Sequence, residues 1–188
     1  MTNQRYIALL RGVNVGRAKR VAMADLCKLI EDLGFADVRS VLNSGNIVFS
    51  ADGIDPGMAA AAIEEGLVLK LGVAARVMVL ASEDLAAVLA ENSLLPVATD
   101  HARLLVFLLP VAAAREALAP LCERDWGDGA LALGQRAAYV WCPDGVLDSA
   151  AAAALGKQLG DATTSRNWNT LCKLYALCSE PAPAPRGA

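Results

Sequence analysis

Residues 38–50, VRSVLNSGNIVFS, contain two short apolar runs separated by turn residues. The turn is Asn43-Ser44-Gly45, in which glycine adopts positive φ freely and asparagine bonds its own backbone. The pattern predicts a β-hairpin with strands at 38–42 and 46–50. The segments on either side of this hairpin determine the fold around it.

A strand and a helix precede the hairpin, and a helix and a strand follow it. Gly34 and Gly72 each stand where a helical pattern of apolar residues stops, and Asp55 stands where one starts. The predicted elements are a strand at 5–11, a helix at 23–33, the hairpin, a helix at 55–71 and a strand at 75–80. The order β-α-β-β-α-β is the split βαβ plan of a ferredoxin-like α+β unit, which we place at residues 1–81.

The second half of the chain partly repeats this order. The predicted elements are a helix at 82–92, a strand at 103–109, a helix at 111–123, a hairpin of strands 130–133 and 136–142, and helices at 148–159 and 167–178. This β-α-β-β-α order has no fourth strand, so we expect a second, related and smaller α/β unit at 82–179 with extra C-terminal helices. Residues 180–188, EPAPAPRGA, are rich in proline and alanine and are expected to form a disordered tail.

Composition excludes several classes of protein. Apolar residues make up 55% of the 188 residues, which is too many for a disordered chain. No run of 18 apolar residues predicts a membrane span, and Met1–Arg11 lacks the apolar core of a secretory signal. The five cysteines form no C-x-x-C pair, so neither a disulfide framework nor a zinc site is expected. We therefore expect a cytoplasmic protein with no metal and no cofactor.

The net charge of −3 is unevenly distributed along the chain. Residues 1–50 carry 7 basic and 4 acidic side chains, residues 51–160 carry 7 and 14, and residues 161–188 carry 3 and 2. Five basic residues precede the first acid, Asp25. This distribution predicts an anion site near the N-terminus, with a solvated basic loop as the alternative.

Two segments of the first half are richer in hydrogen-bond donors than a simple connection needs. The loop 11–16, RGVNVG, has neither the glycine spacing of a dinucleotide fingerprint nor the lysine of a P-loop. Its glycines still allow a ligand to approach the backbone closely. The second segment is the hairpin turn, for which a purely structural role is the alternative. The candidate ligand-binding residues of these segments are Arg11, Asn14, Lys19, Asn43, Ser44 and Asn46.

A third segment, TTSRNWNT at 163–170, precedes a predicted helix. Helix N-termini bind anions because their first N–H groups have no partners. Trp168 offers a flat face for stacking, and Lys173 lies four residues after Asn169 on one helix face. The candidate ligand-binding residues here are Arg166, Asn167, Trp168, Asn169 and Lys173. The alternative is a helix cap followed by a tryptophan in the core.

Catalytic patterns are weak in this sequence. The single histidine, His101, stands at the edge of a loop and is expected to face solvent. No Ser-His-Asp or Cys-His arrangement and no histidine-based metal site is indicated. The sequence therefore leaves open whether the protein is an enzyme and identifies no catalytic residue.

The motifs together, in their order, resemble those of the bacterial DUF1697 family. The resemblance spans residues 5–178 and implies two small α/β units in one chain. It implies no reaction, because the function of that family is unknown. The motifs that carry it are LRGVNVG at 10–16, MADL at 23–26, LGF at 33–35, SGNIVF at 44–49 and TSRNWNT at 164–170, with Lys173-Leu174.

The hypothesis that fits these observations best is binding of an anionic ligand, either a nucleotide-like molecule or a nucleic acid. Phosphate or carboxylate oxygens would meet the loop 11–16 and the segment 166–169, and Trp168 would stack on a base or seal the pocket. One alternative is a small enzyme that acts on an anionic substrate in the same cleft. The other is that these motifs are structural and join the two halves. No membrane partner is expected, and the oligomeric state is not predicted.

Overall fold

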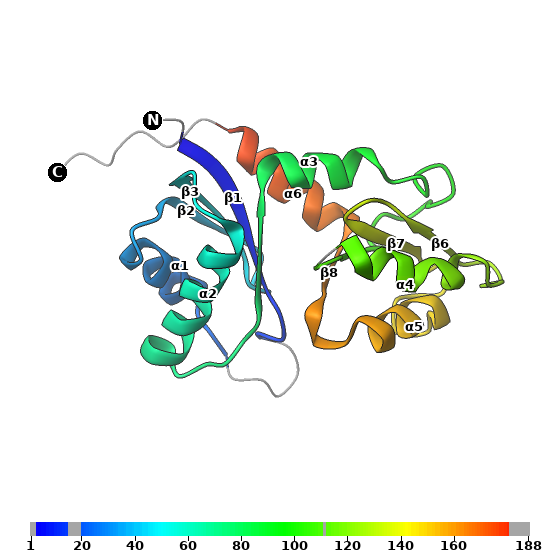
Figure 1. The fold of residues 1–188 in the computed structure, drawn as a ribbon, viewed down its shortest axis with the longest axis horizontal. Helices are drawn as coiled ribbons and strands as arrows, with labels where there is room; N and C mark the ends of the chain where they lie inside the picture. The colour runs from blue at the N-terminus through cyan, green and yellow to red at the C-terminus, as the bar shows by residue number, and fades with distance from the viewer. Residues whose placement is uncertain (1–2, 15–19, 111, 181–188) are drawn as a thin grey trace. The chain divides into compact units, whose positions relative to one another are not determined.

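The computed structural model of the chain describes residues 3–14, 20–110 and 112–180 (Figure 1). The chain divides into two compact units, one of Met1–Leu85 with Lys173–Ala188 and the other of Ala86–Cys172. We call them unit 1 and unit 2 and describe each by itself. Helix α3 (Ser82–Ala90) and helix α6 (Trp168–Ser179) each contribute residues to both units.

Unit 1 confirms the predicted β-α-β-β-α-β order. Its elements are β1 (Asn3–Leu10), α1 (Met23–Asp32), β2 (Ala36–Val41), β3 (Asn46–Asp52), α2 (Pro56–Gly66), the π-helical turn η1 (Leu67–Leu71) and β4 (Val77–Ala81). The strands form one antiparallel sheet in the order β2-β3-β1-β4, which is the ferredoxin-like arrangement. The hairpin predicted at 38–50 is the β2–β3 pair, with Val41 opposite Asn46.

The ends of the second helical segment follow the predicted chemistry. The Asp55 carboxylate accepts a hydrogen bond from the Met58 N–H at 2.9 Å and caps α2. The π-helical turn that extends α2 ends at Gly72, whose φ of +60° lies in the left-handed region that glycine enters without strain. The cap and the stop are therefore where the sequence predicts them.

The core of unit 1 lies between the sheet and helices α1 and α2, which cover one of its faces (Figure 1). Alternate residues of β1 and β3 point into this core, as the two-residue period of a strand requires. Tyr6 stacks on Phe49 with ring centroids 5.5 Å apart, and Phe35 packs against Phe49 at 4.7 Å. Arg5 and Ser50, the neighbours of Tyr6 and Phe49, therefore lie on the opposite face.

Unit 2 repeats the same plan. Its elements are β5 (Leu104–Leu108), α4 (Ala112–Cys122), β6 (Ala130–Leu133), β7 (Ala137–Trp141), α5 (Ala150–Leu159), the 3-10 turn η2 (Gly160–Ala162) and β8 (Thr164–Asn167). The strands lie in the order β6-β7-β5-β8, all antiparallel, and helices α4 and α5 cover one face of this sheet (Figure 1). The hairpin predicted around Gly134 is the β6–β7 pair.

Strand β8 corrects the expectation that the second unit lacks a fourth strand. It pairs with β5, so that Thr164 lies opposite Leu108 and Asn167 opposite Leu105. The strand has only four residues, all polar, and lies at the edge of the sheet. It therefore shows no apolar alternation, and its hydroxyl groups resemble the cap of the helix that follows.

The remaining expectations concern the thiols, the termini and the membrane. All five cysteines are free thiols. The segment expected to be a disordered tail lies outside the described residues except for Glu180. In the described ranges, no helix is both long enough and apolar enough to cross a membrane.

Candidate functional site

The structure brings the loop after β1 and the hairpin turn together at one end of the unit 1 sheet. Leu9 pairs with Asn46, the first residue of β3. The Leu10 N–H donates to the Gly45 carbonyl, and the Arg11 N–H donates to the Arg76 carbonyl, both at 2.8 Å. The sequence alone does not place these loops together, because that requires the strand order. Arg11 is half-buried at this point.

Asn14 links three segments through its side-chain amide. Its Nδ2 donates to the Val21 carbonyl at 2.9 Å and to the Asn43 carbonyl at 2.8 Å. Its Oδ1 accepts from the Val21 N–H at 2.8 Å. Asn14 has a φ of +57°, a conformation that asparagine tolerates better than most residues. The side chain thus holds the loop after β1 against the start of α1 and the hairpin turn.

The hairpin turn packs closely on the same loop. Asn46 is fully buried, and its Nδ2 donates to the Val41 carbonyl at 3.0 Å and to Ser44 Oγ at 2.9 Å. A Cβ atom at Gly45 would lie 2.7 Å from both Leu10 Cβ and Val13 Cγ2. Glycine is therefore needed here for the close approach as well as for its φ of +73°.

A pocket of about 550 Å³ lies beside this junction, at the N-terminus of α1. The N-cap residue, Ala22, supplies no side-chain hydrogen bond to the first N–H groups of α1. The exposed Arg20 adds a cation at the rim, and Asp25 adds a carboxylate in the first turn of the helix. The pocket is lined by Asn14, Arg20, Val21, Ala22, Met23, Asp25 and Asn43.

Of the residues that the sequence predicts to bind a ligand, two line this pocket. Asn14 and Asn43 line it, whereas Ser44 and Asn46 belong to the interior of the turn. Lys19 lies outside the described residues. The sequence singles out the basic loop but not Ala22, whose missing cap becomes informative only once the start of α1 is known.

The Arg166 segment lies in unit 2, where Arg166 is part of edge strand β8. Its Nη1 donates to Thr164 Oγ1 and to the Ser165 carbonyl, both at 2.8 Å. Burial lowers the pKa of the Arg166 guanidinium to about 10. Thr163 donates from Oγ1 to the Leu108 carbonyl at 2.6 Å and so joins β8 to β5. These hydrogen bonds therefore stabilise β8 and its pairing with β5.

Helix α6 starts directly after this strand. Asn167 Oδ1 accepts from the Thr170 N–H at 2.9 Å and from Thr170 Oγ1 at 2.7 Å, which caps the helix. Trp168 is 7% exposed and contacts the exposed His101 ring edge-on, with centroids 6.3 Å apart. Asn169 and Lys173 are exposed on α6.

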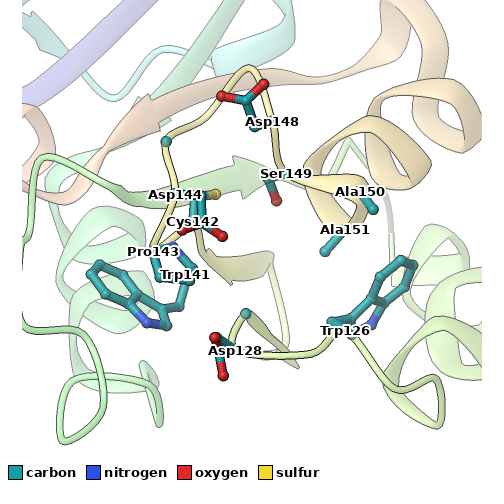
Figure 2. A pocket seen from close by; sticks show the side chains of 12 residues that line it. Trp126, Asp128, Trp141, Cys142, Pro143, Asp144, Asp148, Ser149, Ala150 and Ala151 are labelled. Carbon is teal, nitrogen blue, oxygen red and sulfur yellow. The ribbon is translucent and has the colours of Figure 1, made fainter.

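Unit 2 also contains a pocket that the sequence does not predict (Figure 2). It has a volume of about 120 Å³ and lies beside the start of α5, which Ser149 caps through the Ala152 N–H. Three carboxylates border it, and burial raises the pKa of the Cys142 thiol on its wall. Among the described residues, no group of histidine, cysteine and acidic side chains is arranged to hold a metal ion. The carboxylates belong to Asp128, Asp144 and Asp148.

Comparison with known proteins identifies the family. A solved structure, that of the conserved bacterial protein SP0830 from Streptococcus pneumoniae, resembles the chain with a TM-score of 0.75 and 24% identity. The likeness covers 94% of this chain and 99% of that one, and at this identity it shows the fold. No curated protein matches the chain. The model of the DUF1697 family, described as a protein of unknown function, matches residues 3–139. This chain, with its two ferredoxin-like units, therefore belongs to the DUF1697 family.

Proposed function

We propose that this protein binds an anionic ligand, a nucleotide-like molecule or a nucleic acid, at the start of α1. The observation that carries the proposal is a pocket lined by Arg20 and by the first residues of α1, whose N-cap residue Ala22 gives the helix no side-chain hydrogen bond. Free N–H groups at a helix start favour an anion through direct hydrogen bonds and through the helix dipole.

The surroundings of the pocket support a compact ligand. Arg20 is exposed and makes no hydrogen bond or ion pair within the described ranges, so its guanidinium is available to a phosphate or carboxylate. Asn14 shapes the pocket wall through its bonds to Val21 and Asn43. The acidic stretch 51–160 disfavours long, unspecific contact with a nucleic-acid backbone. A small ligand fits this charge distribution better than a long polymer.

The Arg166 segment of unit 2 is a separate group of donors that could bind an anion. Asn169 and Lys173 are exposed, and both side chains can donate to an anion. The bonds of Arg166 to Thr164 and Ser165 favour a structural role for that residue. Arg166→Ala separates the two roles, because a structural role lowers stability without ligand, whereas a binding role removes only the stabilisation by ligand.

A thermal-shift screen tests the proposal. The panel holds nucleotides, phosphorylated metabolites and short single- and double-stranded oligonucleotides, each at low and high salt. A ligand at 100 times its Kd adds about 2.7 kcal/mol of stability, which is several degrees in Tm. Arg20→Ala is expected to remove the shift, and Lys28→Ala, which deletes an exposed cation on α1 outside the pocket, is expected to keep it.

The pattern of shifts identifies the class of ligand. A shift with one small anion indicates a pocket ligand, and a salt-sensitive shift with oligonucleotides indicates contact with the phosphate backbone. A shift that persists in Arg20→Ala, or no shift with any member of the panel, contradicts the proposed site.

A further inference from the structure

The pocket at the start of α1 contains side chains of both charges. Arg20 and Asp25 line it, and both residues are exposed. Within the described ranges, neither side chain makes a hydrogen bond or an ion pair, so the two charges do not pair with each other. A ligand that matches this pocket therefore offers an anionic group to Arg20 and hydrogen-bond donors to Asp25.

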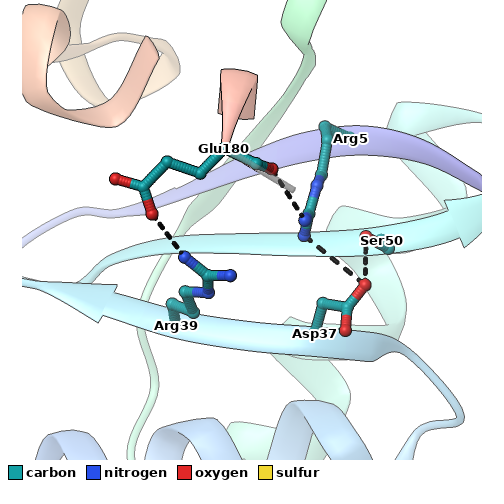
Figure 3. Close-up of polar contacts among 5 residues, drawn as sticks. All are labelled: Arg5, Asp37, Arg39, Ser50 and Glu180. Carbon is teal, nitrogen blue, oxygen red and sulfur yellow. Dashed lines mark hydrogen bonds and ion pairs between the residues drawn. The ribbon is translucent and has the colours of Figure 1, made fainter. Parts of the chain in front are cut away.

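Two other acidic side chains of unit 1 show the contrast with Asp25. On the sheet face opposite α1 and α2, Asp37 forms an ion pair with Arg5, with Oδ2 3.6 Å from Nη1. Glu180 Oε2 accepts a hydrogen bond from Arg39 Nη1 at 2.7 Å (Figure 3). These two carboxylates have partners inside the unit, whereas the acceptor oxygens of Asp25 are available to a ligand.

A carboxylate inside an anion site affects which anions can bind there. Asp25 belongs to the first turn of α1, so an anion held by Arg20 and the N–H groups of that turn meets a like charge. A ligand that offers only negative charge therefore loses affinity. A ligand with hydroxyl groups beside its anion gains affinity instead, because an ionised carboxylate accepts strong hydrogen bonds from hydroxyl groups. The pocket thus favours a hydroxylated phosphate ester over inorganic phosphate.

The pocket is also larger than a phosphate group requires. Its volume of about 550 Å³ lies in the range of small-molecule and cofactor sites. Val21 and Met23 add apolar residues to its wall, and the exposed Asn43 adds an amide that can both donate and accept hydrogen bonds. The pocket therefore has room and matching chemistry for a sugar and a base beside the phosphate.

We propose that Asp25 makes this site specific for a ribonucleotide. Its carboxylate accepts hydrogen bonds from the ribose hydroxyl groups, while the phosphate meets Arg20 and the start of α1. Dinucleotide-binding sites combine the same two contacts, an acidic residue at the ribose hydroxyls and a phosphate at a helix start. The inference rests on the proposed function and narrows it to a mononucleotide with an intact ribose, because a 2′-deoxynucleotide lacks one of the two hydroxyl donors.

The test measures how well the protein distinguishes a ribonucleotide from its 2′-deoxy form. The probes are the ribonucleoside 5′-monophosphates, their 2′-deoxy forms and inorganic phosphate, each titrated by thermal shift against the ligand-free Tm of the same variant. The wild-type chain is expected to bind a ribonucleotide roughly tenfold more tightly than its 2′-deoxy form, because the deoxy form loses a hydrogen bond to a charged group. Asp25→Ala is expected to reduce this ratio to about one and to bind inorganic phosphate at least as tightly as the wild type.

Glu31→Ala is the matched control. Glu31 is exposed on the same helix but does not line the pocket, so its removal changes the net charge equally and is expected to leave the ratio at the wild-type value. If Asp25 acted only on the helix dipole, Asp25→Ala would lower the ligand-free Tm and leave the ratio unchanged. That result overturns the inference.

Equal binding of the ribose and 2′-deoxy forms by the wild-type chain, or binding of neither, also overturns the inference. Arg20→Ala tests the proposed function separately, because it is expected to weaken the binding of nucleotides and of inorganic phosphate alike. If Arg20→Ala removes these shifts while Asp25→Ala keeps the ribonucleotide preference, the specificity fails and the proposed function stands. If Arg20→Ala leaves the shifts intact, the site at α1 is wrong and both proposals fail.

Discussion

At the scale of single residues, the polar side chains of the N-terminal motifs have two kinds of role. Asn14 and Asn46 use their amide groups to bond the backbone of neighbouring segments, so they build the junction between loop and hairpin. The Arg20 side chain makes no hydrogen bond or ion pair within the described ranges, and it is the residue that we expect to contact a ligand. Sequence composition alone does not separate these roles, because both require hydrogen-bond donors.

Replacement of Asn14 tests whether this residue has a structural role. Asn14→Ala leaves two carbonyls and the Val21 N–H without their partner, which we expect to lower the free energy of unfolding by roughly 1–3 kcal/mol. Asn43→Ala is the matched control, since the Asn43 side chain is exposed and its contribution is through its carbonyl. We expect it to change stability by less than about 0.5 kcal/mol. Urea unfolding of both variants measures the difference, and equal stabilities would contradict the structural role of Asn14.

Gly45 tests the close approach of the turn to the loop. Gly45→Ala places a Cβ at 2.7 Å from two carbon atoms, and we expect a loss of roughly 2–4 kcal/mol from this overlap and the positive φ together. Gly12 has the same φ of +73°, but a Cβ added there would meet no atom within 4 Å, so Gly12→Ala isolates the cost of the backbone, about 1–2 kcal/mol. The midpoint of urea unfolding compares them. A smaller loss in Gly45→Ala than in Gly12→Ala would show that the turn relaxes freely.

At the scale of secondary-structure elements, the segment 163–170 shows both the strength and the limit of prediction from sequence. The helix after it is predicted correctly, because apolar residues recur at helical spacing. The strand within it is missed, since Thr164–Asn167 is polar and its pairing with β5 is a long-range contact. By contrast, the strands of unit 1 are predictable because their apolar runs are bounded by glycine and turn residues.

Asn167, which caps α6, is expected to contribute to the stability of that helix. Asn167→Ala removes the acceptor of the Thr170 N–H and hydroxyl, and we expect a loss of about 1 kcal/mol. Asn167→Asp keeps the acceptor and adds a charge that favours a helix start, so it should retain the stability. Thermal unfolding without ligand measures both. If Asn167→Ala instead keeps full stability and loses ligand binding, the residue acts on the ligand rather than on the helix.

At the scale of the whole molecule, the chain repeats one strand order twice, β2-β3-β1-β4 and β6-β7-β5-β8. The sequence predicts all four strands of the first unit but only three of the second. The fourth strand of the second unit, β8, is polar and lies at the edge of its sheet. The site is less predictable than the fold. The sequence identifies the basic loop as a candidate, but the pocket depends on which loops the strand order places at one end of the sheet.

The distribution of tryptophans allows a test of how the two units unfold. All three tryptophans, Trp126, Trp141 and Trp168, belong to unit 2. Because α3 and α6 contribute residues to both units, we expect unit 1 and unit 2 to unfold in one cooperative transition. Gly45→Ala, a change in unit 1, should then lower the midpoint of the tryptophan fluorescence transition as much as that of the far-UV circular dichroism transition. A fluorescence midpoint that stays at the wild-type value would show that the units unfold independently.

The amide bridge of Asn14 has a consequence for protein engineering. Residues 14 and 21 are joined by a pair of hydrogen bonds that close the chain between them into a ring. A graft that exchanges residues 15–19 for a foreign peptide would therefore start and finish at fixed points. The Asn14–Val21 bridge thus offers fixed end points between which a new recognition sequence could be displayed.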